Sequence, residues 1–295
     1  MFKIKNVHHC FFHEISSNEI LRVLFERFGA ILAGGAAYSQ SQGIPISKHL
    51  MKNTTADLDL YFSTEKVYRK AVEYIAESNK KYHVEKSITG MCYNAVPDTN
   101  NYYENSVDQC KIQLVGCLFG KPEDIITSFD FRNLEVCYYF SQGNYMMMYT
   151  DNNRRFSDRL DIRHSSSPFL MHRIYKYMTY RGFAGVTPRS KKFVTDWIVK
   201  ASCGYYEVNR DNCPSIYVDL LDNPCFKKIL KNRELIRNED LALMIGKIKE
   251  DIVEGKKWLD NRGYVVNDFA RVGVRDVVVE EIKSRETISE SKQKI

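Results

Sequence analysis

Three aspartates in separate apolar segments have the residue type and spacing for metal chemistry. Asp57 and Asp59 alternate with leucines in "TADLDLYF", and Asp130 stands between two phenylalanines in "IITSFDFRNLEV". Magnesium prefers oxygen ligands, and it usually takes one or two carboxylates together with phosphate oxygens and water. Two such ions about 4 Å apart can hold the attacking and the leaving oxygens of an in-line displacement. The three acids therefore predict phosphoryl chemistry with two Mg²⁺ or Mn²⁺ ions.

The segments around these acids predict the elements that must position them. Alternation with period two predicts a strand over "ADLDLYF", with Asp57 and Asp59 on one face. The run "GAILAG" predicts an earlier strand, and Gly34–Gly35 allows a tight turn where a side chain would collide with a phosphate or a neighbouring strand. The following "AAYSQSQ" predicts a helix whose first N–H groups can receive an anion.

Asp130 is expected within the strand "DFRNLEVCYYF". An acid between two phenylalanines is costly to bury unless it is paired or ligates a metal. Two competing interpretations need no metal. Asp130 could be an acid in a turn at the start of a strand with its hydrogen bonds met there, and Asp57 and Asp59 could lie on a solvent-facing strand.

Further periodic segments predict a sheet with flanking helices. Ser16 and Glu19 resemble a capping box for a helix over 16–28, and "STEKVYRKAVEYIAESN" and "KPEDIITSF" predict two more helices. The segments "YHVEKSIT", "MCYNAV" and "CKIQLVG" predict strands.

From about residue 150 the pattern changes to longer helical periods. We expect a catalytic domain over 1–150, a helical nucleotide- or acceptor-binding domain over 151–283 and a disordered tail over 284–295. Helices are expected within "SPFLMHRIYKYMTYRGF" and over about 188–203 and 239–261.

Basic side chains in this second half are candidates for holding a triphosphate or an acceptor. Arg173, Lys176 and Arg181 are the candidates for the triphosphate, although a solvated helix face explains them equally well. Tyr177 or Tyr180 could stack on a base, but such aromatics more often pack. A second basic cluster could bind RNA or form ion pairs with the interleaved Asp158 and Asp161, and its members are Arg154, Arg155, Arg159 and Arg163.

Composition limits the compartment and the partners. The chain has 295 residues and a formal net charge of +6, which suits a cleft that receives anions. Its eight cysteines include no CxxC pair, so reduced thiols and a cytoplasmic location are expected, the host cytoplasm if the protein is viral. No apolar run approaches the roughly 20 residues that span a bilayer, so no membrane partner is expected.

The order of these motifs resembles the polymerase-β-like nucleotidyltransferases. The matching positions are Ala33, Gly34 and Gly35, then Asp57-Leu58-Asp59, then Asp130, and "RIYKYMTYRGF" is similar to a segment of uncharacterised viral and phage members. The resemblance implies an α/β nucleotidyltransferase core, a short mixed sheet with flanking helices, followed by a mainly helical C-terminal domain.

The same resemblance implies transfer of a nucleoside monophosphate from a nucleoside triphosphate to an acceptor hydroxyl, with release of pyrophosphate. Asp57 and Asp59 would bind both metals, and Asp130 would orient or deprotonate the acceptor. Gly34, Gly35 and Ala36 would meet the phosphates, although Ala36 replaces the small polar residue that the family often has there.

The acceptor and even the activity stay open at this level. An RNA 3′ end such as that of tRNA, a protein hydroxyl and a small molecule are all compatible with the motifs. A catalytically degenerate nucleotide-binding or interaction module of the same fold is the alternative function, and a structural viral protein is a third.

Overall fold

The structure is a computed structural model that describes residues 1–7, 9–46, 57–78, 82–86, 92–97, 111–155, 158–164, 170–202, 231 and 235–246. The chain divides into two compact units, Met1–Ser157 and Asp158–Ile295. The expected tail over 284–295 and residues 247–261 of the helix expected over 239–261 lie outside the described residues.

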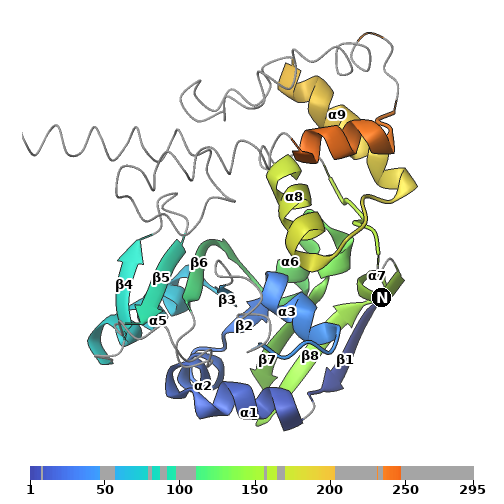
Figure 1. Ribbon diagram of the computed structural model, residues 1–295. Helices are drawn as coiled ribbons and strands as arrows, with labels where there is room; N and C mark the ends of the chain where they lie inside the picture. Colours follow the sequence, from blue (N-terminus) through green and yellow to red (C-terminus); the bar gives the residue numbers. More distant parts are fainter. Residues whose placement is uncertain are drawn as a thin grey trace, which may run out of the picture. The chain divides into compact units, whose positions relative to one another are not determined.

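The first unit is built on one eight-stranded mixed sheet with the order β1-β8-β7-β2-β3-β6-β5-β4 (Figure 1). Neighbouring strands are antiparallel except β3 and β6, which run parallel. The mixed α/β class expected from the sequence is confirmed. The strands are β1 (Phe2–Asn6), β2 (Ile31–Ala33), β3 (Leu58–Phe62), β4 (Tyr82–Lys86), β5 (Cys92–Pro97), β6 (Ile112–Phe119), β7 (Val136–Ser141) and β8 (Asn144–Thr150).

Helices connect and cover these strands. Those expected after β3 and before Asp130 are confirmed as α5 and α6. The helices of this unit are α1 (His9–Ser17), α2 (Glu19–Glu26), α3 (Gly34–Ser41), α5 (Glu65–Ser78), α6 (Pro122–Thr127) and α7 (Asn152–Arg155), with the 3-10 helix η2 (Arg132–Leu134).

The helix predicted over 16–28 is corrected by the structure. The break falls at Asn18, whose side chain accepts a hydrogen bond of 3.0 Å from the Leu21 N–H and so begins α2 at Glu19. Asparagine is among the best N-cap residues, and it outcompetes the predicted capping box. Ser16 instead lies in α1, where its hydroxyl donates to the His13 carbonyl.

Alternate residues of the strands divide the core between the two faces of the sheet. One face, called the α6 face below, carries a buried cluster of Ile31, Ala33, Tyr61, Val115, Cys137 and Met148 beneath Ile125 and Ile126 of α6. On the other face Phe62 contacts Tyr68 of α5, with ring centroids 5.9 Å apart. Because side chains alternate along a strand, Asp59 belongs to the α6 face with Tyr61.

The second unit is helical in its described part. It contains α8 (Leu170–Arg181), the 3-10 helix η3 (Pro188–Ser190), α9 (Lys191–Ser202) and a helical run over 238–246. The helix expected over about 188–203 is therefore confirmed, with its first residues in a 3-10 turn. In the described part of the chain, no helix is long and apolar enough to cross a membrane.

Candidate functional site

Asp57 and Asp59 lie together at the start of β3. Asp57 directly precedes the strand and is buried, whereas Asp59 is half-buried and lies in register with Ala33 of β2 and Gln113 of β6. Their spacing places both carboxylates on the α6 face, beyond the end of its apolar cluster. This face therefore changes from apolar at Tyr61 to acidic at Asp59.

Gly34 brings the start of α3 against the Asp59 carboxylate. A Cβ on Gly34 would lie 2.7 Å from Oδ2 of Asp59, and the φ angle of Gly34 is +75°, a conformation that favours glycine. Gly34 is thus required by the neighbouring carboxylate as well as by the backbone conformation of the turn.

The first turn of α3 is electropositive. Ala33, which precedes the helix, gives no side-chain cap, and the first turn contains no acidic residue. The first N–H groups of an α-helix lack partners within the helix, and the helix dipole attracts anions to them. The Asp59 carboxylate lies beside Gly34, the first residue of this turn.

Asp130 lies at the same end of the sheet as the other two acids, but not within a strand. The strand predicted around it is wrong in its first half, because Asp130 precedes the 3-10 helix η2 and β7 begins only at Val136. Since β3 and β7 both run antiparallel to β2, their first residues lie where β2 gives way to α3. Asp130 is 5% exposed, and α3 packs against both β7 and η2.

The described residues contain no group of three or more His, Cys, Asp or Glu that could hold a metal ion. Asp57 and Asp59 are therefore a pair of carboxylates, with Asp130 near them in the fold and not grouped with them. Two carboxylates are the number that magnesium usually takes when phosphate oxygens and water complete its shell.

The sequence interpretation missed Gln113. This residue is 3% exposed and is the register partner of Asp59 in the parallel neighbour β6. Paired positions on adjacent strands hold their side chains on the same face, about 5 Å apart at Cβ. A single amide inside the apolar run "IQLVG" was the signal that could have found it.

Arg132 was also missed. It is half-buried on η2, the 3-10 helix that packs against α3. Within the described residues it makes no ion pair. It is therefore a candidate cation in the first unit for an anion at the start of α3.

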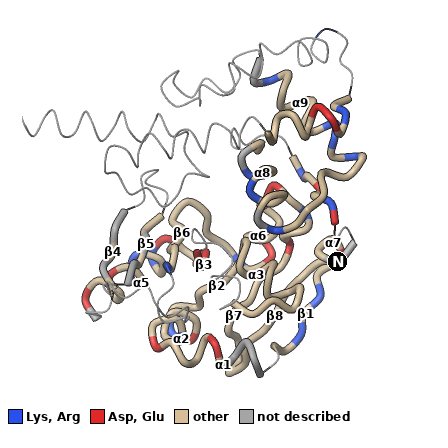
Figure 2. The backbone as a smooth tube through the Cα atoms, in the orientation of Figure 1, with Lys and Arg blue, Asp and Glu red and all other residues tan. Residues whose placement is uncertain are grey.

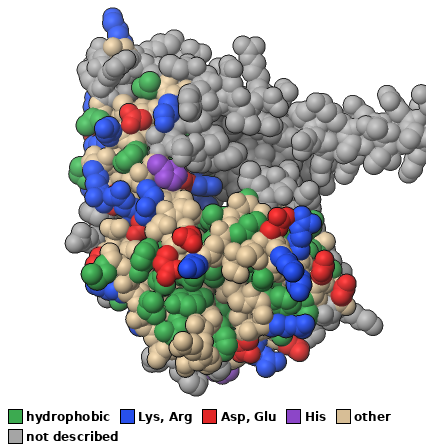
Figure 3. Space-filling view, turned by 180° about the vertical axis from the view of Figure 1, so that it is seen from behind, with side chains coloured by type: hydrophobic (Ala, Val, Ile, Leu, Met, Phe, Trp, Pro, Cys, Tyr) green, Lys and Arg blue, Asp and Glu red, His purple; other side chains and the backbone are tan. Residues whose placement is uncertain are grey.

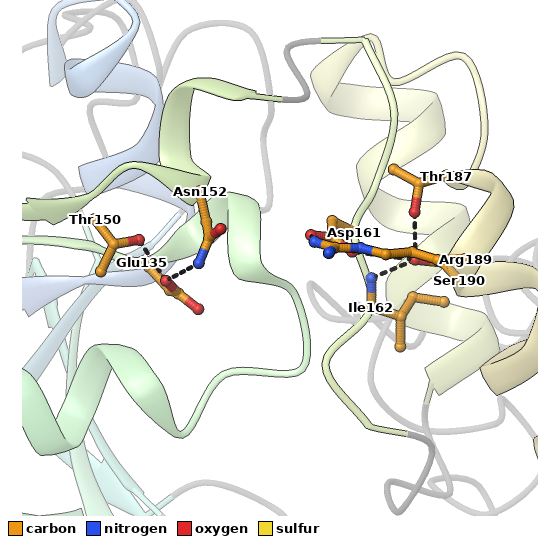
Figure 4. A network of polar contacts seen from close by, with 8 residues as sticks. All are labelled: Glu135, Thr150, Asn152, Asp161, Ile162, Thr187, Arg189 and Ser190. Carbon is orange, nitrogen blue, oxygen red and sulfur yellow. Dashed lines mark hydrogen bonds and ion pairs between the residues drawn. The ribbon is translucent and has the colours of Figure 1, made fainter. Parts of the chain in front are cut away.

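A buried polar network supports this end of the sheet (Figure 4). Glu135, the residue before β7, is 1% exposed, and its Oε2 accepts hydrogen bonds from the Thr150 hydroxyl and, at 2.9 Å, from Asn152 Nδ2. Asn153 Nδ2 donates to the Asn133 carbonyl at 2.7 Å and so ties α7 to η2. These bonds fix the segment that carries Asp130.

The cations predicted for the triphosphate belong to the second unit. Arg173 is exposed on α8, and Lys176 and Arg181 are half-buried on the same helix. Figure 2 shows basic positions along α8. Tyr177 is buried and meets Phe183 edge to face, with ring centroids 6.2 Å apart, so it packs within this unit. The Tyr180 side chain lies outside the described residues.

The predicted arginine cluster is only partly described. The side chains of Arg154 and Arg155 lie outside the described residues, Arg159 approaches its neighbour Asp158 at 3.9 Å, and Arg163 is half-buried. Asp161 is fully buried and pairs with Arg189, which departs from the interleaved surface network that the sequence indicated. One face of the molecule shows basic side chains grouped beside a histidine (Figure 3).

Comparison with protein families gives one match for the first unit. The model of the family described as Gabija anti-defense 2 family protein matches residues 3–158. This finding corrects the resemblance to the polymerase-β-like nucleotidyltransferases, because the matching family is a different one. No curated protein matches the chain.

Proposed function

We propose that this chain, which belongs to the Gabija anti-defense 2 family, is an enzyme that transfers a nucleoside monophosphate from a nucleoside triphosphate to an acceptor hydroxyl. Membership of an anti-defense family indicates a phage protein. We place the reaction in the cytoplasm of the host and assign it to countering the defence that the family description names.

One observation carries this proposal: the Asp59 carboxylate lies against Gly34 at the first turn of α3. A carboxylate pair can bind a divalent cation, and the first N–H groups of a helix can bind a phosphate. A nucleoside triphosphate with its magnesium is a ligand that needs both at adjacent places. The short first turn, with Gly35 and Ala36 after Gly34, keeps side chains small where the phosphates would approach.

The donor set of this pair fits magnesium, since it offers hard carboxylate oxygens and leaves the remaining positions to phosphate and water. Asp57 and Asp59 would hold the metal. When bound, Mg²⁺ or Mn²⁺ supplies neutralisation of phosphate charge and favours the ionised form of a coordinated hydroxyl. Positioning and electrostatic stabilisation provide most of the rate in phosphoryl transfer, so few other side chains are needed.

The remaining roles fall to residues of the first unit. The backbone N–H groups of Gly34, Gly35 and Ala36 bind the phosphates, and Arg132 on η2 adds a positive charge. The acceptor oxygen forms a bond to the α-phosphorus while the bond from that phosphorus to the bridging oxygen breaks and pyrophosphate leaves. Asp130 orients the acceptor hydroxyl and accepts its proton.

A second candidate function is nucleotide binding without transfer. It is favoured by the absence, in the part of the chain that the structure describes, of a third carboxylate grouped with Asp57 and Asp59. Such a module would bind the triphosphate with magnesium through the same residues but would release no pyrophosphate.

The experiment that separates these functions follows pyrophosphate and label together. The full chain is mixed with each α-³²P-labelled nucleoside triphosphate, magnesium and either host RNA or host protein. Incorporated label with equal pyrophosphate release supports transfer and identifies the acceptor class. Magnesium-dependent triphosphate binding without either product would favour the binding module.

A further inference from the structure

Strand β1 forms one edge of the eight-stranded sheet, and among the strands that the structure describes it pairs with β8 alone. All five of its residues, Phe2–Asn6, are exposed. Edge strands carry backbone N–H and C=O groups that can pair with another chain, so proteins usually shield or charge them.

The hydrogen-bonding pattern shows which backbone groups of β1 face outward. The Val7 N–H donates to the Tyr145 carbonyl at 3.0 Å, so these two residues form a hydrogen-bonded pair. The register pairs Lys5 with Met147 and Lys3 with Tyr149, at steps of two residues along β1. In an antiparallel pair the bonded positions alternate. Lys3 and Lys5 are therefore bonded to β8, and the backbone groups of Phe2, Ile4 and Asn6 point to the free edge.

The side chains of β1 divide into an apolar and a basic set. Phe2 is 41% exposed and Ile4 is 54% exposed, on the same face as Met148 of the apolar cluster. Lys3 pairs with Asp151 at 2.5 Å, with both side chains about half exposed. Lys5 has no ion pair within the described residues, and its ammonium lies 5.8 Å from the centre of the Tyr149 ring.

The alternation of charge argues against a second copy of the chain at this edge. In every antiparallel self-pairing that overlaps three or more residues and bonds the outward positions, a lysine of one β1 lies opposite a lysine of the other. Like charges directly opposite each other destabilise a strand pair. An acidic side chain at the same position would be attracted instead.

We propose that the free edge of β1 binds an extended segment of a partner protein in which acidic residues alternate with apolar ones. The segment adds a strand to the sheet through the outward groups of Phe2, Ile4 and Asn6. Its apolar residues pack beside Phe2 and Ile4, and its acids lie opposite Lys3 and Lys5. Main-chain bonds supply the affinity in this mode of recognition, and alternate side chains supply the specificity.

The probes are two soluble eight-residue peptides, one alternating valine with glutamate and one alternating valine with lysine. Binding to the ¹⁵N-labelled full chain is followed by amide shifts and hydrogen exchange. The glutamate peptide should shift and protect the amides of Phe2, Ile4 and Asn6, and it should leave those of Lys3 and Lys5 exchanging as before. It should bind about tenfold more tightly than the lysine peptide, because the charges opposite Lys3 and Lys5 are attractive in the first peptide and repulsive in the second.

Two variants test the two halves of the proposal. Ile4→Pro removes an outward N–H and spares the ladder to β8, so it should weaken the glutamate peptide about three- to tenfold with an unchanged melting temperature. Lys5→Glu should bring the affinities of the two peptides close together or reverse their order, and Lys66→Glu on exposed α5 should leave their order unchanged.

Equal affinity for the two peptides, or no change at the outward amides at millimolar peptide, would overturn the proposal. So would a dimer in light scattering that Ile4→Pro dissociates, because a second copy would then occupy the edge. If Ile4→Pro fails to fold, Lys5→Glu still decides the question.

Discussion

The Asp59 carboxylate occupies the space that a side chain on Gly34 would need, with Oδ2 only 2.7 Å from the position of a Cβ. This relationship joins the strand that carries the acid pair to the first turn of α3. Glycine is needed at position 34 for two reasons, the contact with Asp59 and the positive φ angle. A substitution at this position therefore tests whether the carboxylate lies there.

Gly34→Ala should lower the free energy of unfolding by about 2–4 kcal/mol and weaken magnesium-dependent triphosphate binding. The matched control is Gly43→Ala, because Gly43 has φ +79° but no atom within 4 Å of an added Cβ. Gly43→Ala should lower the free energy of unfolding by about 1 kcal/mol, from backbone strain alone, and should still bind the triphosphate with magnesium. Urea unfolding and calorimetric titration measure both effects, and equal losses in the two variants would contradict the predicted collision.

Gln113→Glu should make stability strongly dependent on magnesium. A third carboxylate beside Asp59 adds like-charge repulsion without metal and another oxygen ligand with it. We expect a lower melting temperature than wild type in EDTA and a larger rise on adding magnesium. Gln142→Glu, at an exposed turn, is the control and should show neither effect. If the rise is the same in all three proteins, Asp59 does not hold the metal.

Thr150→Val should destabilise the end of the sheet that carries η2. The variant removes one of the donors to the buried Glu135 carboxylate and leaves the one from Asn152, and a hydrogen bond to a charged group contributes about 1.5–3 kcal/mol. Thr179→Val, at an exposed position of α8, should change stability by less than about 0.5 kcal/mol. Urea denaturation of the two variants gives the comparison, and equal stability would remove the structural role assigned to the network.

Tyr68 should contribute to a loss of stability at high pH. Burial raises the pKa of this phenol from 10.0 to about 12, and the residue is 7% exposed. The folded state then binds the proton more tightly than the unfolded state, so this contribution is complete below pH 10 and is lost as the pH rises towards 12. Tyr68→Phe should reduce the fall in unfolding free energy across this window. A curve with the wild-type slope would show that Tyr68 ionises normally.

The acid pair and its strand could be predicted from sequence because alternation is a local signal. The period of two around Asp57 and Asp59 can be recognised without knowledge of the rest of the fold. The same holds for the two glycines that begin α3. Asp130 was placed in a strand because its segment is apolar, although a 3-10 helix anchored by Asn153 interrupts it.

Pairing between distant segments could not be predicted in the same way. Gln113 becomes a neighbour of Asp59 only through the register of β3 with β6, which a single sequence does not specify. Asn18 was missed for a different reason, since two capping patterns competed within a few residues and the asparagine prevailed.

Whether Asp59 is needed for transfer is decided by comparing wild type with Asp59→Asn at equal magnesium, with label from α-³²P nucleoside triphosphate as the readout. Asp158→Asn, at an exposed site in the second unit, is the matched control. The proposed function predicts that wild type and Asp158→Asn label an RNA or protein acceptor and release pyrophosphate, while Asp59→Asn loses at least about 100-fold of this activity. Undiminished transfer by Asp59→Asn, or no transfer by wild type with any of the nucleotides, would contradict it.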